Sequence, residues 1–508
     1  MIRKRQFAAH SIILLLALLL SACVSPETTL APEIKAEQAQ SLPAGAATPE
    51  ILLPAPTFPS RPRYSPAELV DYTVQCGDTL PNLAARFNTS IEQIQEANSF
   101  IPLSATTLPP GMPMKIPIYY LPFWGSPYQI LPDSLFVNGP SQRDFDTSGF
   151  VNSHPGWLKG YTSYVSDVNR SGAEIVDLVA RNFSLSPRLL LALLEYKAGA
   201  LSQTDVEPEV QDYPLGVKEW RQKGLFLQLT YVANLLNDGY YRFRQSRLLE
   251  LEHSDGTLER VDPWQNAATV SLQNYFNTLL EYDDYLRAIS PEGFARIYQD
   301  LFGDPWQDIQ PHIPVSLVQP EFILPFEPGE VWAYTGGPHT AYGRLEPYAA
   351  IDFAPPSVGS GCLPSDIWAT AVAPGTVVRS GDGEVMLDLD NDGDERTGWN
   401  IFYLHVATEG RAQLGAILRQ GERVGHPSCE GGQSTGTHVH IARKYNGEWI
   451  PSEGYQGIMA FNLEGWIAHN GSRVYLGTLT RNSQVVTACT CSNAASFIQS
   501  DRPVTAQK

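Results

Sequence analysis

The sequence predicts a multidomain α+β protein with a small βααβ module, a helical middle region and a mainly antiparallel-β C-terminal domain. A chain of 508 residues, 43% of them hydrophobic, is long enough for several domains with separate cores. Apolar residues at helical spacing run through positions 163–310, whereas β-branched runs separated by glycine-rich turns follow position 322. The net charge of −19 argues against nucleic acid as a partner.

The N-terminus predicts export and a lipid anchor. Basic residues at positions 3–5 precede an apolar stretch at 11–20, which is too short to span a bilayer by itself. The sequence Leu-Ser-Ala-Cys at 20–23 resembles the lipobox of bacterial lipoproteins. This resemblance implies a signal peptide at 1–22 and a lipid on Cys23 that anchors the protein outside the cytoplasm to the cell membrane or the outer membrane. An ordinary secretory signal is the alternative.

Residues 23–67 are predicted to be a disordered tether between the lipid and the first folded module. They are rich in proline, alanine, glutamate, serine and threonine and show no hydrophobic periodicity. A tether of this length, if extended, reaches on the order of 100 Å, which is enough to carry the folded part into a cell wall.

Residues 68–118 predict the βααβ module. The stretch Tyr-Thr-Val-Gln-Cys-Gly-Asp-Thr-Leu at 72–80 predicts a strand and a turn, Ser90 fits the N-cap of a short helix, and Gly-Met-Pro-Met-Lys-Ile-Pro closes the segment at 111–117. These motifs resemble the LysM domain, which implies binding of peptidoglycan and other glycans that contain N-acetylglucosamine. The resemblance places the glycan groove between the loop after the second helix and a loop formed by Gly77, Asp78, Thr79 and Leu80. The alternative is a LysM fold that serves only as a spacer.

A proline- and glycine-rich linker is predicted at 119–162, followed by the helical region at 163–310. One helix in it, at 187–197, begins with Ser-Pro and resembles the first helix of lytic transglycosylases. That family places a catalytic glutamate where this chain has Lys197, and Glu195 lies about 200° around the helix from that position. The region is therefore interpreted as transglycosylase-like in shape with the acid position lost, or as an unrelated helical spacer.

The C-terminal domain is predicted at 322–472, with a polar tail at 473–508. Its most conspicuous motif is His438-x-His440 on a β-branched run, preceded by a glycine-rich stretch. Because residues i and i+2 of a strand point to the same face, both imidazoles can enter one site. A pair of this kind is by itself more often an ordinary pair of strand histidines than a metal site.

Further motifs around this pair resemble the M23 family of zinc endopeptidases, which cut peptide crosslinks of peptidoglycan. They include Ala-Pro-Gly-Thr-Val-Val at 373–378, Tyr-Leu-His at 403–405 and Ser-Thr-Gly-Thr-His-Val-His at 434–440. The commonest form of this family takes its first zinc ligands from His-x-x-x-Asp, but this chain has Tyr348 at the histidine position before Asp352. The staphylolysin and β-lytic branch instead places the histidine thirteen residues before the aspartate, and His339 stands there.

The resemblance to this branch implies zinc ligands at His339, Asp352 and His440. Two nitrogens, one carboxylate and a water form an ordinary tetrahedral catalytic zinc site. By the same analogy, His405 and His438 hold and deprotonate the attacking water and return its proton to the leaving amine.

Three more features of this domain have open or structural interpretations. Tyr403 stands two residues before His405 and is therefore expected on the same face of a strand, where it is predicted either to hydrogen-bond the tetrahedral intermediate or to be a core residue. His426 and His469 are predicted to be structural. The acidic stretch at 388–394 resembles the start of a calcium loop but lacks the glutamate at its twelfth position, so a solvated hairpin turn is the preferred interpretation.

Export implies an oxidising compartment, in which the cysteines can pair. After Cys23 the chain has five more cysteines, so at least one of them is unpaired within a monomer. We expect Cys362 and Cys429 to pair, because both flank the site that the resemblance implies. Cys489 is left to pair with Cys491 or with Cys76.

Taken together, these motifs predict a lipid-anchored zinc endopeptidase that acts on peptide stems or crosslinks of peptidoglycan and is held at the wall by a LysM domain. The rival hypothesis is a catalytically silent scaffold of the same architecture that activates other cell-wall hydrolases. The feature that separates the two is His339, because a degenerate domain has no metal-binding reason to keep it.

Overall fold

The computed structural model describes residues 56–502 except 57, 120–123, 357–360 and 491–492. The predicted signal peptide, Cys23 and most of the tether lie outside this range, as does Cys491. No helix within the described range is long and apolar enough to cross a membrane.

The first folded element is the predicted βααβ module. Strand β1 (Glu68–Thr73) pairs antiparallel with β2 (Pro113–Ile118), and helices α1 (Leu80–Phe87) and α2 (Ile91–Ala97) lie between them in the sequence. Thr79 caps α1, and Ser90 caps α2 in a capping box with Gln93. This prediction of the fold is confirmed, because capping residues and turn glycines are local signals that the sequence carries openly.

The middle of the chain is helical, as predicted, and folds around one large core. Its longest helix, α8 (Leu225–Arg244), packs against α9 (Ala267–Leu279). The other elements are α3 (Asp133–Phe136), α4 (Thr147–Ser153), α5 (Gly172–Phe183), α6 (Pro187–Ala198), α7 (Pro208–Asp212), α10 (Tyr282–Ala288), α11 (Phe294–Phe302) and the hairpins β3 (Thr162–Val165) to β4 (Val168–Ser171) and β5 (Glu250–Glu252) to β6 (Leu258–Arg260).

The helical region begins earlier than the sequence predicted. Helices α3 and α4 lie inside the segment at 119–162 that was expected to be a linker. The buried carboxylate of Asp133 accepts hydrogen bonds from the Asn266 side chain and the Ala268 amide at the start of α9. This long-range contact, which proline and glycine content does not reveal, fastens the segment to the helical core.

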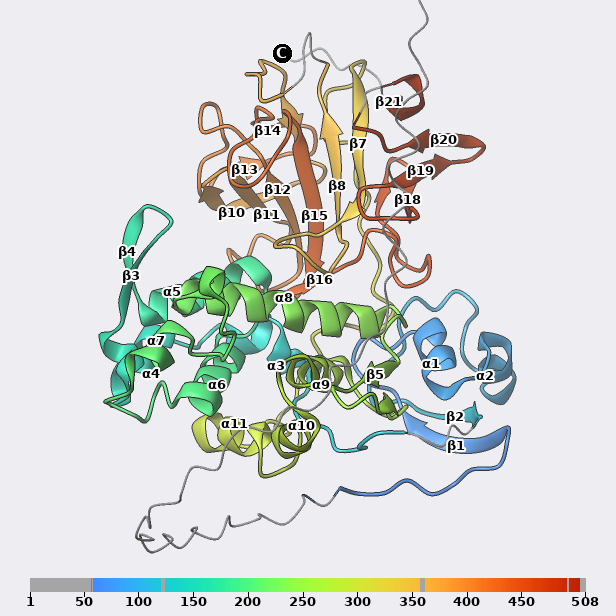
Figure 1. Cartoon of the computed structure of the whole chain (residues 1–508). Coiled ribbons are helices and arrows are strands. Elements are labelled where there is room, and N and C mark those ends of the chain that lie inside the picture. The colour runs from blue at the N-terminus through green and yellow to red at the C-terminus, as the bar shows by residue number, and fades with distance from the viewer. Residues whose placement is uncertain (1–55, 57, 120–123, 357–360, 491–492, 503–508) are drawn as a thin grey trace, which may run out of the picture. The chain divides into compact units, whose positions relative to one another are not determined.

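The C-terminal domain is built on an antiparallel nine-stranded sheet, as predicted (Figure 1). The strand order is β13-β10-β11-β12-β15-β8-β7-β21, and β16 pairs with β15. The strands are β7 (Val331–His339), β8 (Ala350–Ala354), β10 (Gly375–Gly381), β11 (Glu384–Asp388), β12 (Trp399–Leu404), β13 (Ile417–Leu418), β15 (Val439–Tyr445), β16 (Glu448–Trp449) and β21 (Phe497–Gln499). A smaller sheet joins β9 (Ala369–Thr370) to β14 (Arg423–Gly425).

The two faces of the large sheet belong to different cores. Ile351, Tyr403 and Ile441 point into the core of the C-terminal domain itself. The alternate residues Phe402 and Ala442 belong instead to the core of the helical region. The helical region therefore covers one face of the sheet.

The polar tail predicted at 473–508 is largely part of the C-terminal domain. Strands β17 (Asn462–Leu463), β18 (Trp466–Asn470), β19 (Gly477–Arg481) and β20 (Gln484–Thr487) form a four-stranded sheet. Strand β21 then pairs with β7 and adds an edge strand to the large sheet. The prediction of a tail was wrong because these strands are short and carry exposed polar residues, which resemble a loop in the sequence.

Candidate metal centre

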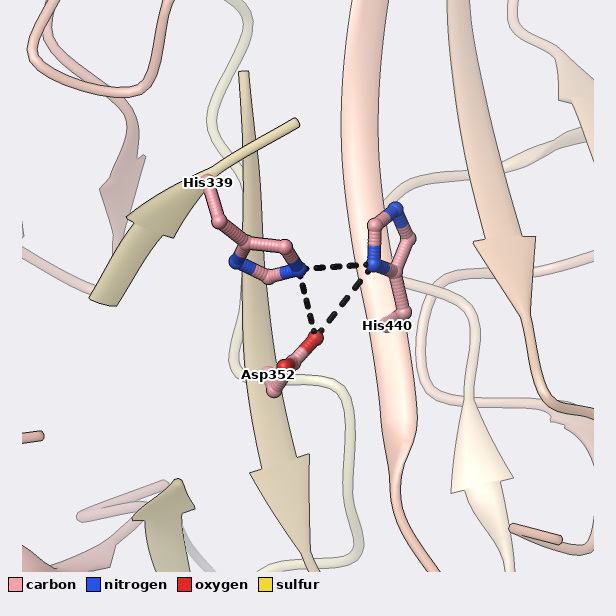
Figure 2. Close-up of side chains that lie close together, drawn as sticks. All are labelled: His339, Asp352 and His440. Carbon is pink, nitrogen blue, oxygen red and sulfur yellow. Dashed lines mark hydrogen bonds and ion pairs between the residues drawn. The ribbon is translucent and has the colours of Figure 1, made fainter. Parts of the chain in front are cut away.

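Three predicted ligands converge on one point of the large sheet (Figure 2). His339 ends β7, Asp352 lies on β8, and His440 lies on β15 directly opposite Asp352. His339 Nε2 lies 3.0 Å from His440 Nδ1 and 3.2 Å from Asp352 Oδ1, and His440 Nδ1 lies 3.4 Å from that oxygen. Ligand atoms about 2.1 Å from a tetrahedral zinc lie about 3.4 Å from one another, so the spacing fits this metal.

The hydrogen bonds on the far sides of the two imidazoles determine whether the nitrogens that face the centre carry a proton or a lone pair. His339 Nδ1 donates to the carbonyl of Gly337 at 2.9 Å, and His440 Nε2 donates to the carbonyl of Ala341 at 3.1 Å. The nitrogens that face the centre therefore carry lone pairs. Asp352 Oδ1 is buried and accepts no hydrogen bond from the described residues. Three acceptors that converge without a donor are suited to a cation, so this group could hold a metal ion.

The electrostatics favour an ionised Asp352 and a neutral His440. Burial by itself raises the pKa of Asp352, but His339 and His438 outweigh it and hold that pKa well below its usual range. Burial, followed by the neighbouring imidazoles, lowers the pKa of His440. An ionised carboxylate beside a neutral imidazole is the form in which both groups bind a divalent cation.

The two remaining predicted histidines stand beside this centre. His405 Nδ1 donates to the carbonyl of Glu430 at 2.8 Å, and His438 Nδ1 donates to the carbonyl of Gly436 at 2.8 Å. Their rings are 4.5 Å apart, and His438 Nε2 lies 3.7 Å from Asp352 Oδ1. Burial, with help from His438, lowers the pKa of His405 to about 3, so this imidazole is a neutral proton acceptor at neutral pH.

Comparisons with known proteins give relatives for most of the chain. Residues 72–117 match the LysM domain family, and residues 129–316 match the family described as LasA, N-terminal domain. Protease LasA from Pseudomonas aeruginosa is 25% identical over 345 residues, which cover 64% of this chain and 75% of that protein. The chain is a LysM-bearing homologue of LasA-like peptidases.

Two further relatives match mainly the C-terminal part. The β-lytic metalloendopeptidase of Achromobacter lyticus is 29% identical over 149 residues, 27% of this chain and 37% of that protein. Among solved structures, the M23 metalloprotease pseudoalterin is 23% identical and covers 34% of this chain and 96% of its own, with a TM-score of 0.28. The catalytic domain of lysostaphin from Staphylococcus simulans is 21% identical and covers 24% of this chain and 87% of its own, with a TM-score of 0.18.

In this LasA-like homologue, Tyr403 does not reach the metal centre. Its ring is fully buried on the opposite face of β12 from the site, and its hydroxyl accepts a hydrogen bond from the Val372 amide at 2.8 Å. The expectation of a shared face with His405 assumed continuous strand geometry, but His405 has φ +64° and turns the other way. The core alternative for Tyr403 is therefore the one that the structure supports.

Tyr475 is a residue at the site that sequence reasoning missed. Its ring stacks on the His339 imidazole with the centroids 4.3 Å apart, and its carbonyl accepts a hydrogen bond from the Gly337 amide at 2.8 Å. Tyr475 thus holds both the ring of a predicted ligand and the turn that orients it. It lies in the stretch predicted as a tail, where no motif pointed to it.

The disulfide between Cys362 and Cys429 is present, as predicted, with the Cα atoms 5.8 Å apart. It fastens the chain next to Glu430, whose carbonyl orients His405. Cys489 is also disulfide-bonded, and Cys76 is the unpaired thiol among the described cysteines.

The structural interpretations of the other polar motifs agree with their contacts. His426 Nδ1 donates to the Ile367 carbonyl, and His469 Nε2 lies 2.8 Å from the Thr480 hydroxyl. In the acidic stretch at 388–394, the Asp388 carboxylate accepts backbone N–H groups of the turn itself. Glu195 likewise accepts the amides of the loop after α6 and so serves that loop.

The four residues predicted to bind glycan are buried in this structure. Asp78 forms an ion pair with Arg86 at 2.8 Å, and Thr79 is used as the N-cap of α1. Gly77 lies directly beneath the guanidinium of Arg244 from the helical region, and Leu80 is 5% exposed. Glycan binding by this loop stays a prediction.

Proposed function

We propose that the chain is a zinc-dependent endopeptidase that hydrolyses peptide stems or crosslinks of peptidoglycan. In this proposal a lipid on Cys23 anchors it to the membrane, and the LysM domain holds it at the wall. The observation that carries the enzymatic part is the convergence of His339 Nε2, Asp352 Oδ1 and His440 Nδ1 without a donor among them.

His339, Asp352 and His440 would hold the metal, and the open side of the site would face water and substrate. A bound Zn²⁺ would supply a water with a pKa near 7 and would polarise the scissile carbonyl. A structural zinc site would be closed by a fourth protein ligand, often cysteine. The two described disulfide cysteines nearest the site are bonded to each other, so neither thiolate is free to close it.

His405 and His438 are the proton-handling groups in this proposal. The carbonyls of Glu430 and Gly436 hold their Nδ1–H groups, so that each Nε2 is left as an acceptor. One of them takes the proton from the attacking water, and the protonated imidazole then gives it to the leaving amine. The lowered pKa of His405 keeps it in the accepting form before the reaction begins.

The proposed substrate class rests on two kinds of support. The LysM match suggests a location at a glycan-containing wall, and the homologues are named as a protease and a metalloendopeptidase. The rival, a silent scaffold, is disfavoured because all three ligand positions hold residues that can bind a metal, and carbonyls orient the two histidines among them.

Zinc content measured on the full chain tests the proposal. We expect one zinc per wild-type chain, lost in His339→Ala together with cleavage of purified peptidoglycan. His469→Ala, a histidine of the same domain outside the site, is the matched control and should keep both. A fragment that stops at 472 is unsuitable, because it lacks Tyr475 and strand β21. A folded wild-type chain that binds no zinc would refute the enzymatic proposal.

A further inference from the structure

The connector between α11 and the peptidase sheet lies on the LysM domain. We call residues 312–318 the strap. Thr106 Oγ1 donates to the Leu317 carbonyl at 2.9 Å, and Thr107 Oγ1 donates to the Pro314 carbonyl at 3.2 Å. The Leu317 amide donates back to Thr107 Oγ1 at 3.1 Å. The strap is thus bound to the loop that follows the second LysM helix.

The same strap also contacts the other LysM loop. The Ile313 amide donates to Cys76 Sγ at 3.2 Å, and His312 Nδ1 lies 3.3 Å from that sulfur. Arg244 of α8 donates to the Cys76 carbonyl and covers Gly77. These two loops adjoin each other, since the Leu108 amide donates to the Asp78 carbonyl. The strap therefore contacts Thr106 and Thr107 on one side of the predicted glycan groove and Cys76, next to Gly77, on the other.

The strap has an inner and an outer face. Ile313 is 2% and Leu317 is 5% exposed, whereas Val315 and Val318 are 55% and 69% exposed. The two inner residues pack with Trp399 and Ile450 of the peptidase domain and with Cys76 of the LysM domain. Burial of these two branched side chains stabilises the strap in addition to its hydrogen bonds.

A buried ionic cluster fastens the first residue of the strap to the peptidase domain. His312 Nε2 lies 2.8 Å from Glu448 Oε2, and Arg244 lies 2.7 Å from Glu448 Oε1. All three side chains are nearly inaccessible to solvent. Removal of the strap from the LysM loops therefore requires this cluster to open or the connector to separate from it.

We infer that the strap masks the glycan-binding loops of the LysM domain. The inference rests on the proposed glycan binding by this domain and adds its regulation. Oligomers of N-acetylglucosamine and the strap compete for the same two loops, so the full chain binds glycan only in the fraction of molecules whose strap has left. The apparent dissociation constant is the intrinsic one divided by that fraction.

Calorimetric titration of the full chain with a soluble N-acetylglucosamine hexamer tests this. The double variant Ile313→Asp and Leu317→Asp places two charges on the inner face and opens the strap. Val315→Asp and Val318→Asp place the same charges on the outer face of the same connector and form the matched control. We expect at least tenfold tighter binding by the inner variant and no change in the control.

Hydrogen exchange of residues 74–80 and 106–108 reports whether the strap has opened. Equal affinity of wild type and inner variant, with faster exchange in the latter, would overturn masking and leave glycan binding intact. Absence of binding by the opened variant would overturn both, while the zinc content that tests the peptidase proposal would be unaffected. If the charged variant fails to fold, Ile313→Ala with Leu317→Ala must change affinity in the same direction.

Discussion

Substitution of Gly336 by alanine should disable the metal centre without removing any ligand. Gly336 on β7 is directly opposite Asp352 on β8, and a Cβ at this position would lie 2.3 Å from Asp352 Oδ2. Ordinary contacts of a carbon atom lie at roughly 3.5 Å, so the carboxylate would have to retreat by about 1 Å. Both strands are buried and paired, so the backbone cannot move far enough to remove this overlap.

The expected loss can be worked from this displacement. Metal–ligand distances tolerate deviations of about 0.2 Å, and a shift of about 1 Å exceeds that limit several times over. Disturbing the groups that orient metal ligands typically costs 10–100-fold in affinity. We therefore expect zinc affinity to fall by about 100-fold, which corresponds to about 2.8 kcal/mol.

Competition of the full chain with a chromophoric zinc chelator measures this change, and urea unfolding of the metal-free chain controls for stability. Gly381→Ala is the matched control, because a Cβ there has open space around it. It should bind zinc like the wild type. Unchanged zinc affinity in Gly336→Ala would show that Asp352 is not a ligand and would refute the assignment of the centre.

Three further predictions concern the groups around the site and the strap. Tyr403→Phe should lower the free energy of unfolding by about 1–3 kcal/mol, because the buried Val372 amide loses its acceptor. Peptidoglycan cleavage per folded molecule should be unchanged. A large loss of turnover would instead show that Tyr403 has a catalytic role. Burial by itself lowers the pKa of His312, but Cys76 and Glu448 outweigh burial and raise this pKa to about 10. The wild type should therefore lose stability relative to His312→Gln as the pH rises from 6.5 to 10. Urea midpoints of the two proteins that change equally with pH would contradict this prediction. Replacing Cys362 and Cys429 together by serine should lower the free energy of unfolding by about 4 kcal/mol, because the disulfide links residues 67 positions apart in the sequence. Denaturant unfolding measures this change. A loss below about 1 kcal/mol would argue against an entropic origin of the stabilisation.

The parts of the structure that were predicted correctly are those that short local motifs indicate. Ser90 was predicted to be an N-cap, and it caps α2 as the capping rule requires. The thirteen-residue interval pointed to His339 and Asp352, which lie on the neighbouring strands β7 and β8 on either side of the loop at 340–349. Signals of this kind depend on a few adjacent residues, so they survive without knowledge of the fold.

The parts that escaped prediction depend on long-range packing. Strand alternation placed Tyr403 with His405, but the left-handed backbone at His405 breaks the alternation after the last residue of β12. Tyr475 reaches His339 from a stretch 136 positions further along the chain, for which no periodicity exists. The position of the strap was likewise not predicted, because its partners come from two separate regions, the LysM domain and the C-terminal domain.

The orientation of His440 connects the metal centre to the helical region. Its Nε2 donates to the Ala341 carbonyl, in a loop that the helical region holds by several bonds. Asn234 accepts the Arg344 amide at 2.7 Å, and Arg247 pairs with the buried Glu346 at 2.6 Å. The imidazole of this predicted ligand is thus oriented by a loop that is held by residues about a hundred positions earlier. The segment that matches the LasA N-terminal domain therefore helps to position His440 in the candidate metal centre. Substitutions in its helices are expected to alter metal affinity even where they replace no ligand.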